Sequence, residues 1–91
     1  MSSAETEASE MDELMSDPRF QNLLGKAESH QWKFRPKESA LLDSTGELVP
    51  MLQRRTKECW ELLSISRKAG MSLSEAQEVA YPKILVPSET N

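Results

Sequence analysis

The sequence predicts a mainly α-helical fold: a small three-helix domain preceded by a disordered acidic tail, with a short β-hairpin as one alternative between helices one and two. Apolar residues recur three and four apart over residues 18–29, 50–69 and 72–81, the spacing of one face of a helix. Proline, glycine and serine stand at the ends of these segments, where helices begin and end. The chain of 91 residues has room for one small domain, which we place at residues 18–87.

The tail, residues 1–17, is strongly acidic. It holds six carboxylates and no Lys or Arg, whereas the rest of the chain holds 11 basic residues against nine acidic ones. Residues 1–9 are small and polar, so they cannot bury enough apolar surface to offset the entropy of ordering. We expect the tail to be largely disordered, with a short amphipathic turn at Met11, Leu14 and Met15. Such a tail keeps a protein soluble, or competes with nucleic acid for a basic surface, or docks on a partner.

The first predicted helix covers residues 18–29. Asp17 suits the N-cap and Pro18 suits the first helical position. Gly25 weakens this helix by about 1 kcal/mol relative to alanine, so the helix depends on packing. Its apolar face is formed by Phe20, Leu23, Leu24 and Ala27.

The link from residue 31 to residue 49 has two interpretations. Trp32 and Phe34 alternate with basic residues, which predicts a short strand with both aromatic rings in the core. Stacking of these two rings on single-stranded nucleic acid is a minor alternative. Turn-forming residues at 43–46 stand between apolar residues, which favours either a β-hairpin or a helical turn over 38–42 followed by a loop.

Residues 50–69 carry the strongest helical pattern. Pro50 suits the first turn, and Gly70 suits a C-terminal cap because glycine readily adopts the left-handed conformation. Basic residues in the last turn complement the helix dipole. The apolar surface of this helix is broad and contains Leu52, Thr56, Cys59, Trp60, Leu62, Leu63, Ile65 and Ala69.

The last predicted helix, residues 72–81, completes a tight corner with the long helix. Ser72 and Glu75 fit a capping box, and Pro82 ends the helix. The corner over residues 59–81 has the spacing of a helix-turn-helix unit, a motif that can read DNA. The apolar run that follows packs on the domain or binds a partner, and residues 88–91 form a frayed end.

The chemistry of the chain favours a protein that is not an enzyme. Cys59 and His30 are the only residues of their types, and Cys59 lies on an apolar helix face, where a thiol behaves as a buried hydrophobe. The sequence has no glycine-rich phosphate loop, HExxH or CxxC, so we expect no metal, cofactor or small-molecule substrate. It has neither a secretory signal nor an apolar run near the roughly 18 residues of a membrane span, so we expect a cytoplasmic location.

We therefore expect a small, non-enzymatic interaction protein whose partner is another macromolecule, with a protein favoured. A homodimer is one form of this hypothesis, because a thin core gains from burying Trp60 or the apolar run against a second copy. The candidate contact residues are Met11, Met15, Ile84, Leu85 and Val86.

The alternative function is a DNA-associated regulator that uses the helix-turn-helix-like unit at residues 59–81. Glu75 and Glu78 argue against DNA reading, because two carboxylates on the second helix would repel the phosphate backbone. The candidate nucleic-acid contacts are Arg54, Arg55, Lys57, Arg67, Lys68 and Gln77.

Overall fold

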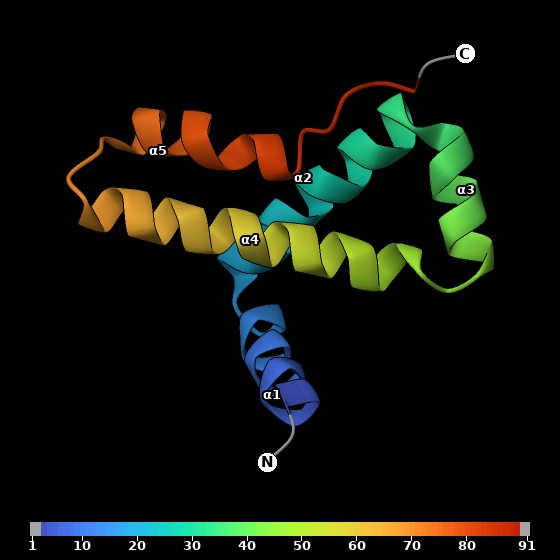
Figure 1. The fold of residues 1–91 in the computed structure, drawn as a ribbon, viewed down its shortest axis with the longest axis horizontal. Coiled ribbons are helices and arrows are strands. Elements are labelled where there is room, and N and C mark those ends of the chain that lie inside the picture. Colours follow the sequence, from blue (N-terminus) through green and yellow to red (C-terminus); the bar gives the residue numbers. More distant parts are fainter. Residues whose placement is uncertain (1–2, 90–91) are drawn as a thin grey trace.

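A computed structural model of the chain, which describes residues 3–89, is built from helices (Figure 1). No strand occurs among these residues, so the mainly α fold is confirmed and the strand and hairpin expected within 31–49 are wrong. Five α-helices and one 3₁₀ helix follow in order: α1 (Ser3–Met15), α2 (Pro18–Phe34), α3 (Pro36–Ser44), α4 (Leu48–Lys68), α5 (Leu73–Ala80) and η1 (Tyr81–Lys83).

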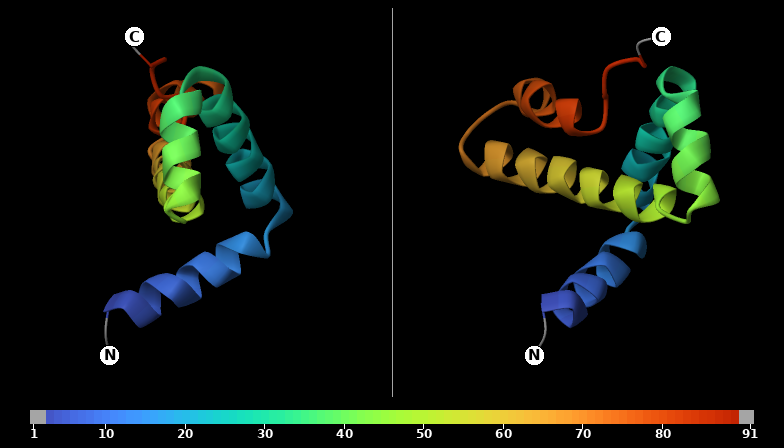
Figure 2. Two further views of the ribbon diagram at one scale, coloured as in Figure 1. Left: turned by 90° about the vertical axis from the view of Figure 1, so that its right-hand side faces the viewer. Right: turned by 45° about the vertical axis from the view of Figure 1, so that its right-hand side comes forward.

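The long helix α4 is the centre of the fold. It packs against α2 and α3 on one part of its length, and α5 folds back along it after a tight turn (Figure 1). Helix α1 projects away from the other helices, on the side of α4 opposite α5, in all three views (Figures 1 and 2). The chain therefore has a compact body formed by α2 to η1 and one helical arm.

The core lies where α2, α4 and α5 meet. Small side chains at Cys59, Ala76 and Ala80, each 0% exposed, let α5 approach α4 closely. Phe20 is also fully buried, and its ring meets the Trp60 ring edge-on at 5.6 Å. Fully burying a large apolar side chain contributes about 1.5–3 kcal/mol. The remaining buried apolar residues are Leu23, Ala27, Leu48, Met51, Leu52 and Ile84.

Helix α1 replaces most of the tail that we expected to be disordered. The segment Ser3–Met15 is helical, and residues 1–2 of that predicted tail lie outside the described residues. Residues with high helix propensity, such as Ala, Glu, Met and Leu, dominate this segment. The Glu10 carboxylate also pairs with the Lys57 ammonium of α4 at 2.7 Å. Helix propensity and this ion pair with α4 both favour the helix in a segment whose composition alone suggested disorder.

Helix α2 begins as predicted but runs five residues further than expected, to Phe34. Asp17 is its N-cap and accepts a hydrogen bond from the Arg19 amide at 2.9 Å. The Arg19 side chain also donates to Asp17, which holds the pKa of this carboxyl below its usual value. Trp32, 39% exposed, and Phe34, 37% exposed, lie on the last turns of α2. The prediction that these rings are core anchors on a strand is therefore wrong.

Gln31 takes the buried position that the sequence assigned to the aromatic rings. Its side-chain amide donates to Glu38 at 3.0 Å and its carbonyl oxygen accepts from Arg55 at 3.1 Å. Arg35 also donates to Glu38, at 2.9 Å, and this hydrogen bond lowers the pKa of the Glu38 carboxyl. A polar network, rather than an aromatic pair, thus joins α2, α3 and α4.

The corner between α4 and α5 is confirmed almost residue by residue. The Met71 amide donates to the Ser66 carbonyl and the Gly70 amide to the Arg67 carbonyl, both at 3.1 Å, which is the Schellman pattern. Ser72 and Glu75 form the predicted capping box, with each side chain bonded to the other's amide at 3.2 Å. The loop is therefore held by backbone and capping bonds at both helix ends.

Two glycine substitutions should change stability in opposite directions. Gly70 has φ of +97°, so Gly70→Ala should lower the free energy of unfolding by about 1–2 kcal/mol. Gly25 lies inside α2 with open space around the position of an added Cβ, so Gly25→Ala should raise it by about 0.5–1 kcal/mol. Urea denaturation followed by circular dichroism measures both. Equal effects of the two substitutions would contradict the left-handed turn at Gly70.

The C-terminal segment forms hydrogen bonds with α2, with α3 and with Arg35 between them. The Val86 carbonyl lies 2.8 Å from His30 Nε2, and the Pro87 carbonyl accepts from Arg35 at 2.9 Å. Glu89 donates its amide to the Phe34 carbonyl at 2.9 Å and accepts from the Glu38 amide at 2.6 Å. Of the end predicted to be frayed, residues 88–91, Glu89 makes these two hydrogen bonds, and residues 90–91 lie outside the described part of the chain.

Candidate functional site

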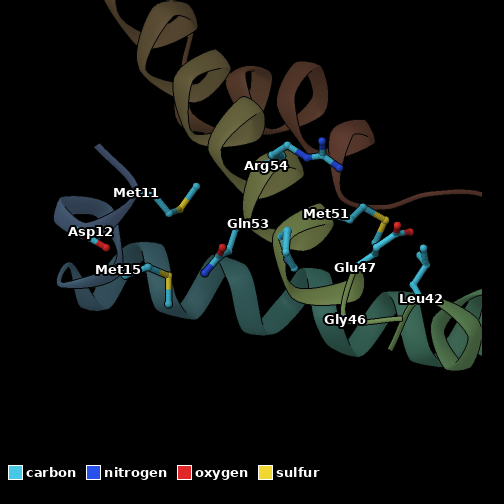
Figure 3. Close-up of a pocket in the computed structure, with 10 residues that line it drawn as sticks. Met11, Asp12, Met15, Leu42, Gly46, Glu47, Met51, Gln53 and Arg54 are labelled. Atoms are coloured by element: carbon cyan, nitrogen blue, oxygen red, sulfur yellow. The ribbon is translucent and has the colours of Figure 1, made fainter. Parts of the chain in front are cut away.

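A groove of about 820 Å³ lies between α1 and the start of α4. Its apolar lining comes from three segments: Met11 and Met15 from α1, Leu42 from α3, and Pro50 and Met51 from α4. In Figure 3 the two methionines of α1 lie at one end of the groove and Leu42 and Met51 at the other. The groove is thus a surface that exists only when these segments fold together.

Local structure explains how each wall is placed. Met11 and Met15 are four residues apart, so they share one face of α1. Gly46 has φ of +77°, a conformation that favours glycine, and it lets the chain turn between α3 and α4. That turn brings Pro50, in the first turn of α4, back toward Leu42 of α3. Met11, Met15 and Leu42 are half-buried, so part of each side chain remains available for contact.

The groove also has charged walls. The residues that line it include two acidic ones, Asp12 and Glu47, and one basic one, Arg54. Next to Arg54, the Lys57 ammonium contacts Glu10 at 2.7 Å and Glu61 at 3.8 Å. The ion pair with Glu10 links α1 to α4 and therefore helps to hold the groove's two long walls together.

The predicted protein contacts fall into two separate groups. Met11 and Met15 line the groove, whereas Leu85 borders a different recess of about 450 Å³ beside Tyr81 and Pro82. The first lies beside α1 and the second beside α5 and η1, and these elements lie on opposite sides of α4 (Figure 1).

Within the apolar run, only part of the surface is available. Ile84 is 2% exposed and packs in the protein's own core, so it is not available to a partner as it stands. Leu85 is 40% exposed, and Val86 is half-buried with its carbonyl on His30.

The predicted nucleic-acid contacts do not form one patch. Arg55 donates to Gln31, Lys57 pairs with Glu10, and Arg67 donates to the Met71 carbonyl at 3.1 Å. Arg54 is exposed in the first half of α4 and Lys68 at its last residue, and Gln77 lies on α5 beside the recess at Leu85. Three of the six side chains thus serve contacts within the protein.

Sequence reasoning found the two α1 methionines of the groove but missed Leu42, Pro50 and Met51. One signal was present: five methionines in 91 residues, three of which meet in this groove. Methionine is unbranched and polarisable, and it is common on surfaces that adapt to partners.

The side chains of Cys59 and His30 both make contacts within the fold. Cys59 is 0% exposed, and burial raises the pKa of its thiol to about 11, so it is neutral at physiological pH. The His30 ring stacks against Phe34 at 4.4 Å and bonds to the Val86 carbonyl. Among the described residues, no three His, Cys, Asp or Glu side chains are grouped to hold a metal ion.

The Cys59 thiol should react slowly with a disulfide reagent in the native protein at neutral pH and rapidly after unfolding in urea. Its pKa rises from an ordinary 9.0 to about 11 on folding, so the unfolded chain ionises first as the pH is raised. The free energy of unfolding should therefore fall as the pH rises through this interval. Rapid labelling of the folded protein at neutral pH would contradict the buried position.

Neither a family model, a curated protein nor a solved structure matches this chain. No described helix has both the length and the apolar character needed to cross a membrane. The function is therefore inferred from the groove's own residues and charges.

Proposed function

We propose that the protein is a small non-enzymatic interaction protein, and that it binds another protein in the groove between α1 and the start of α4. The observation that carries this proposal is the meeting of Met11, Met15 and Met51 with Leu42 and Pro50 in one open recess. Residues from three helices form it, so the folded chain itself creates the surface.

The shape and chemistry of the groove suit a protein segment. Grooves with apolar walls commonly receive the apolar face of a helix, whose anchors recur at three- and four-residue spacing. Flexible methionine side chains can adjust to the anchors of a partner. Charged side chains at Asp12, Glu47 and Arg54 provide the polar rim that surrounds the apolar centre of a typical interface.

The environments of Cys59 and His30, the two residues best suited to nucleophilic chemistry, support the non-enzymatic part of the proposal. The Cys59 thiol is buried and neutral, and the His30 ring is occupied by the Val86 carbonyl. Nucleophilic catalysis requires a thiolate or a base beside the nucleophile, with access to a substrate.

A pull-down from extract of the source cell, run with and without nuclease, tests the proposal. Three forms serve as bait: the native protein, Met11→Ala/Met15→Ala, and the matched control Ile65→Ala/Leu73→Ala. Ile65, near the end of α4, is 62% exposed, and Leu73, the first residue of α5, is 56% exposed, so the control removes similar apolar surface outside the groove.

We expect the same protein to be recovered by the native and control baits and lost by the groove variant. Equal recovery by all three baits would contradict the groove as the binding site. Recovery that depends on nucleic acid, and disappears with nuclease, would instead favour the DNA-associated function at residues 59–81.

A further inference from the structure

We infer that the partner presents a basic amphipathic helix to this groove. The inference rests on the proposed function and adds the chemistry of the occupant. Its basis is the combination of an apolar groove with walls in which carboxylates outnumber basic groups.

One lining carboxylate, that of Asp12, is exposed on α1, and Glu10, next to Met11 in the chain, remains half exposed in its ion pair with Lys57. At the other end of the groove Glu47 adds a further carboxylate, whereas Arg54 is the basic residue among the lining side chains. Lys or Arg on the polar flank of a partner helix would be attracted to these walls, and Asp or Glu would be repelled.

The apolar residues lie at both ends of the groove. Met11 and Met15 form one apolar end and Leu42 and Met51 the other, with Gln53 between them (Figure 3). A helix that crosses this space can place apolar side chains one or two turns apart against the two ends. The flexible methionine side chains can adjust to the partner's apolar anchors. The charged walls determine which charge is favoured on the partner's flanking residues.

The same charges disfavour three other occupants. A second copy that joined groove to groove by two-fold symmetry would bring the acidic α1 helices near each other. The phosphates of a nucleic acid and the headgroups of an anionic membrane would be repelled by the carboxylates of Asp12 and Glu47. A basic helix is the class of partner that satisfies both the apolar and the charged parts of the groove.

The test uses fluorescence anisotropy with the full chain and three labelled synthetic peptides of about 14 residues, or four helical turns. One peptide places Leu and Lys at amphipathic helical spacing, the second replaces Lys by Glu, and the third is a scrambled form of the first. The protein variants are Met11→Gln/Met15→Gln with control Ile65→Gln/Leu73→Gln, and Asp12→Lys with control Glu78→Lys. Ile65, Leu73 and Glu78 are exposed outside the groove, and circular dichroism checks that each variant is folded.

We expect the Leu-Lys helix to bind at least about tenfold tighter than the other two peptides at about 0.05 M salt, with a smaller preference at about 0.3 M. Met11→Gln/Met15→Gln should weaken this binding about tenfold, and its control should not. Asp12→Lys should weaken binding of the Leu-Lys peptide and strengthen binding of the Leu-Glu peptide. Glu78→Lys should leave the preference for the Leu-Lys peptide unchanged.

The possible failures separate the two proposals. Equal binding of Leu-Lys and Leu-Glu helices, still lost in Met11→Gln/Met15→Gln, would overturn the basic partner and leave the groove as a protein-binding site. Peptide binding that is unchanged by the methionine substitutions, or no binding of any peptide, would overturn the inference of a basic partner helix. Either result would also remove the support that the groove gives to the proposed function. A dimer by light scattering that the Leu-Lys peptide does not dissociate, and that Asp12→Lys alters, would assign the groove to a second copy.

Discussion

Phe20→Ala should lower the free energy of unfolding by about 3–5 kcal/mol, the largest effect of a single side-chain truncation that we expect. The Phe20 side chain is 0% exposed, and its ring meets the Trp60 ring edge-on at 5.6 Å and 72°. Truncation removes this contact and leaves a cavity between α2 and α4. Small domains are stable by roughly 5–15 kcal/mol, so the variant would lose a large share of the total.

Phe34→Ala is the matched control, since it makes the same chemical change on the same helix. Phe34 is 37% exposed and its ring contacts His30 and Lys33, so we expect a loss of about 1 kcal/mol. Urea unfolding, followed by far-ultraviolet circular dichroism, gives both values. A loss at Phe34 equal to that at Phe20 would show that the buried end of α2 has been assigned to the wrong residues.

The two phenylalanines also show why sequence reasoning succeeded at one end of α2 and failed at the other. Phe20 belongs to a run of apolar residues at helical spacing, so its burial followed from periodicity. Phe34 and Trp32 offered only two alternations with basic residues, which are too few to distinguish a strand from the last turns of a helix. Tertiary contacts decide which residue at this end of α2 is buried. Gln31 is the buried one, because its side chain forms hydrogen bonds with Glu38 and Arg55.

The corner between α4 and α5 was predictable because its signals are local. Gly70 supplies the left-handed residue, and Ser72 and Glu75 cap the next helix through bonds that span three residues. Helix α1 was missed for the opposite reason. Its composition argued for disorder, and the ion pair between Glu10 and Lys57 joins residues 47 positions apart in the chain.

The groove could be predicted only in part for the same reason. The spacing of Met11 and Met15 is visible in the sequence, but Leu42, Pro50 and Met51 come from segments that meet them only in the folded chain. At the C-terminal end, an apolar run of three residues gives no sign of which side chain turns inward. The structure selects Ile84 for the core and leaves Leu85 at the surface.

Ile84→Ala should therefore behave as a core substitution and lower the free energy of unfolding by about 2–5 kcal/mol. Ile84 is 2% exposed and belongs to the same apolar cluster as Leu23, Leu52 and Ala80. Its amide also donates to the Tyr81 carbonyl at 2.9 Å, which fixes the backbone at the end of the 3₁₀ helix. Truncation would remove the side chain that this backbone directs into the core. The shift of the urea midpoint measures the resulting loss in the free energy of unfolding.

Leu85→Ala, one residue away, should cost less than about 1 kcal/mol, because Leu85 is 40% exposed. The contrast between the two positions depends on the register of the C-terminal segment, which His30 and Arg35 hold through the carbonyls of Val86 and Pro87. A shift of that register would exchange the two side chains and reverse the order of the two losses. A larger loss at Leu85 than at Ile84 would thus place Ile84 at the surface and return it to the residues that a partner could contact.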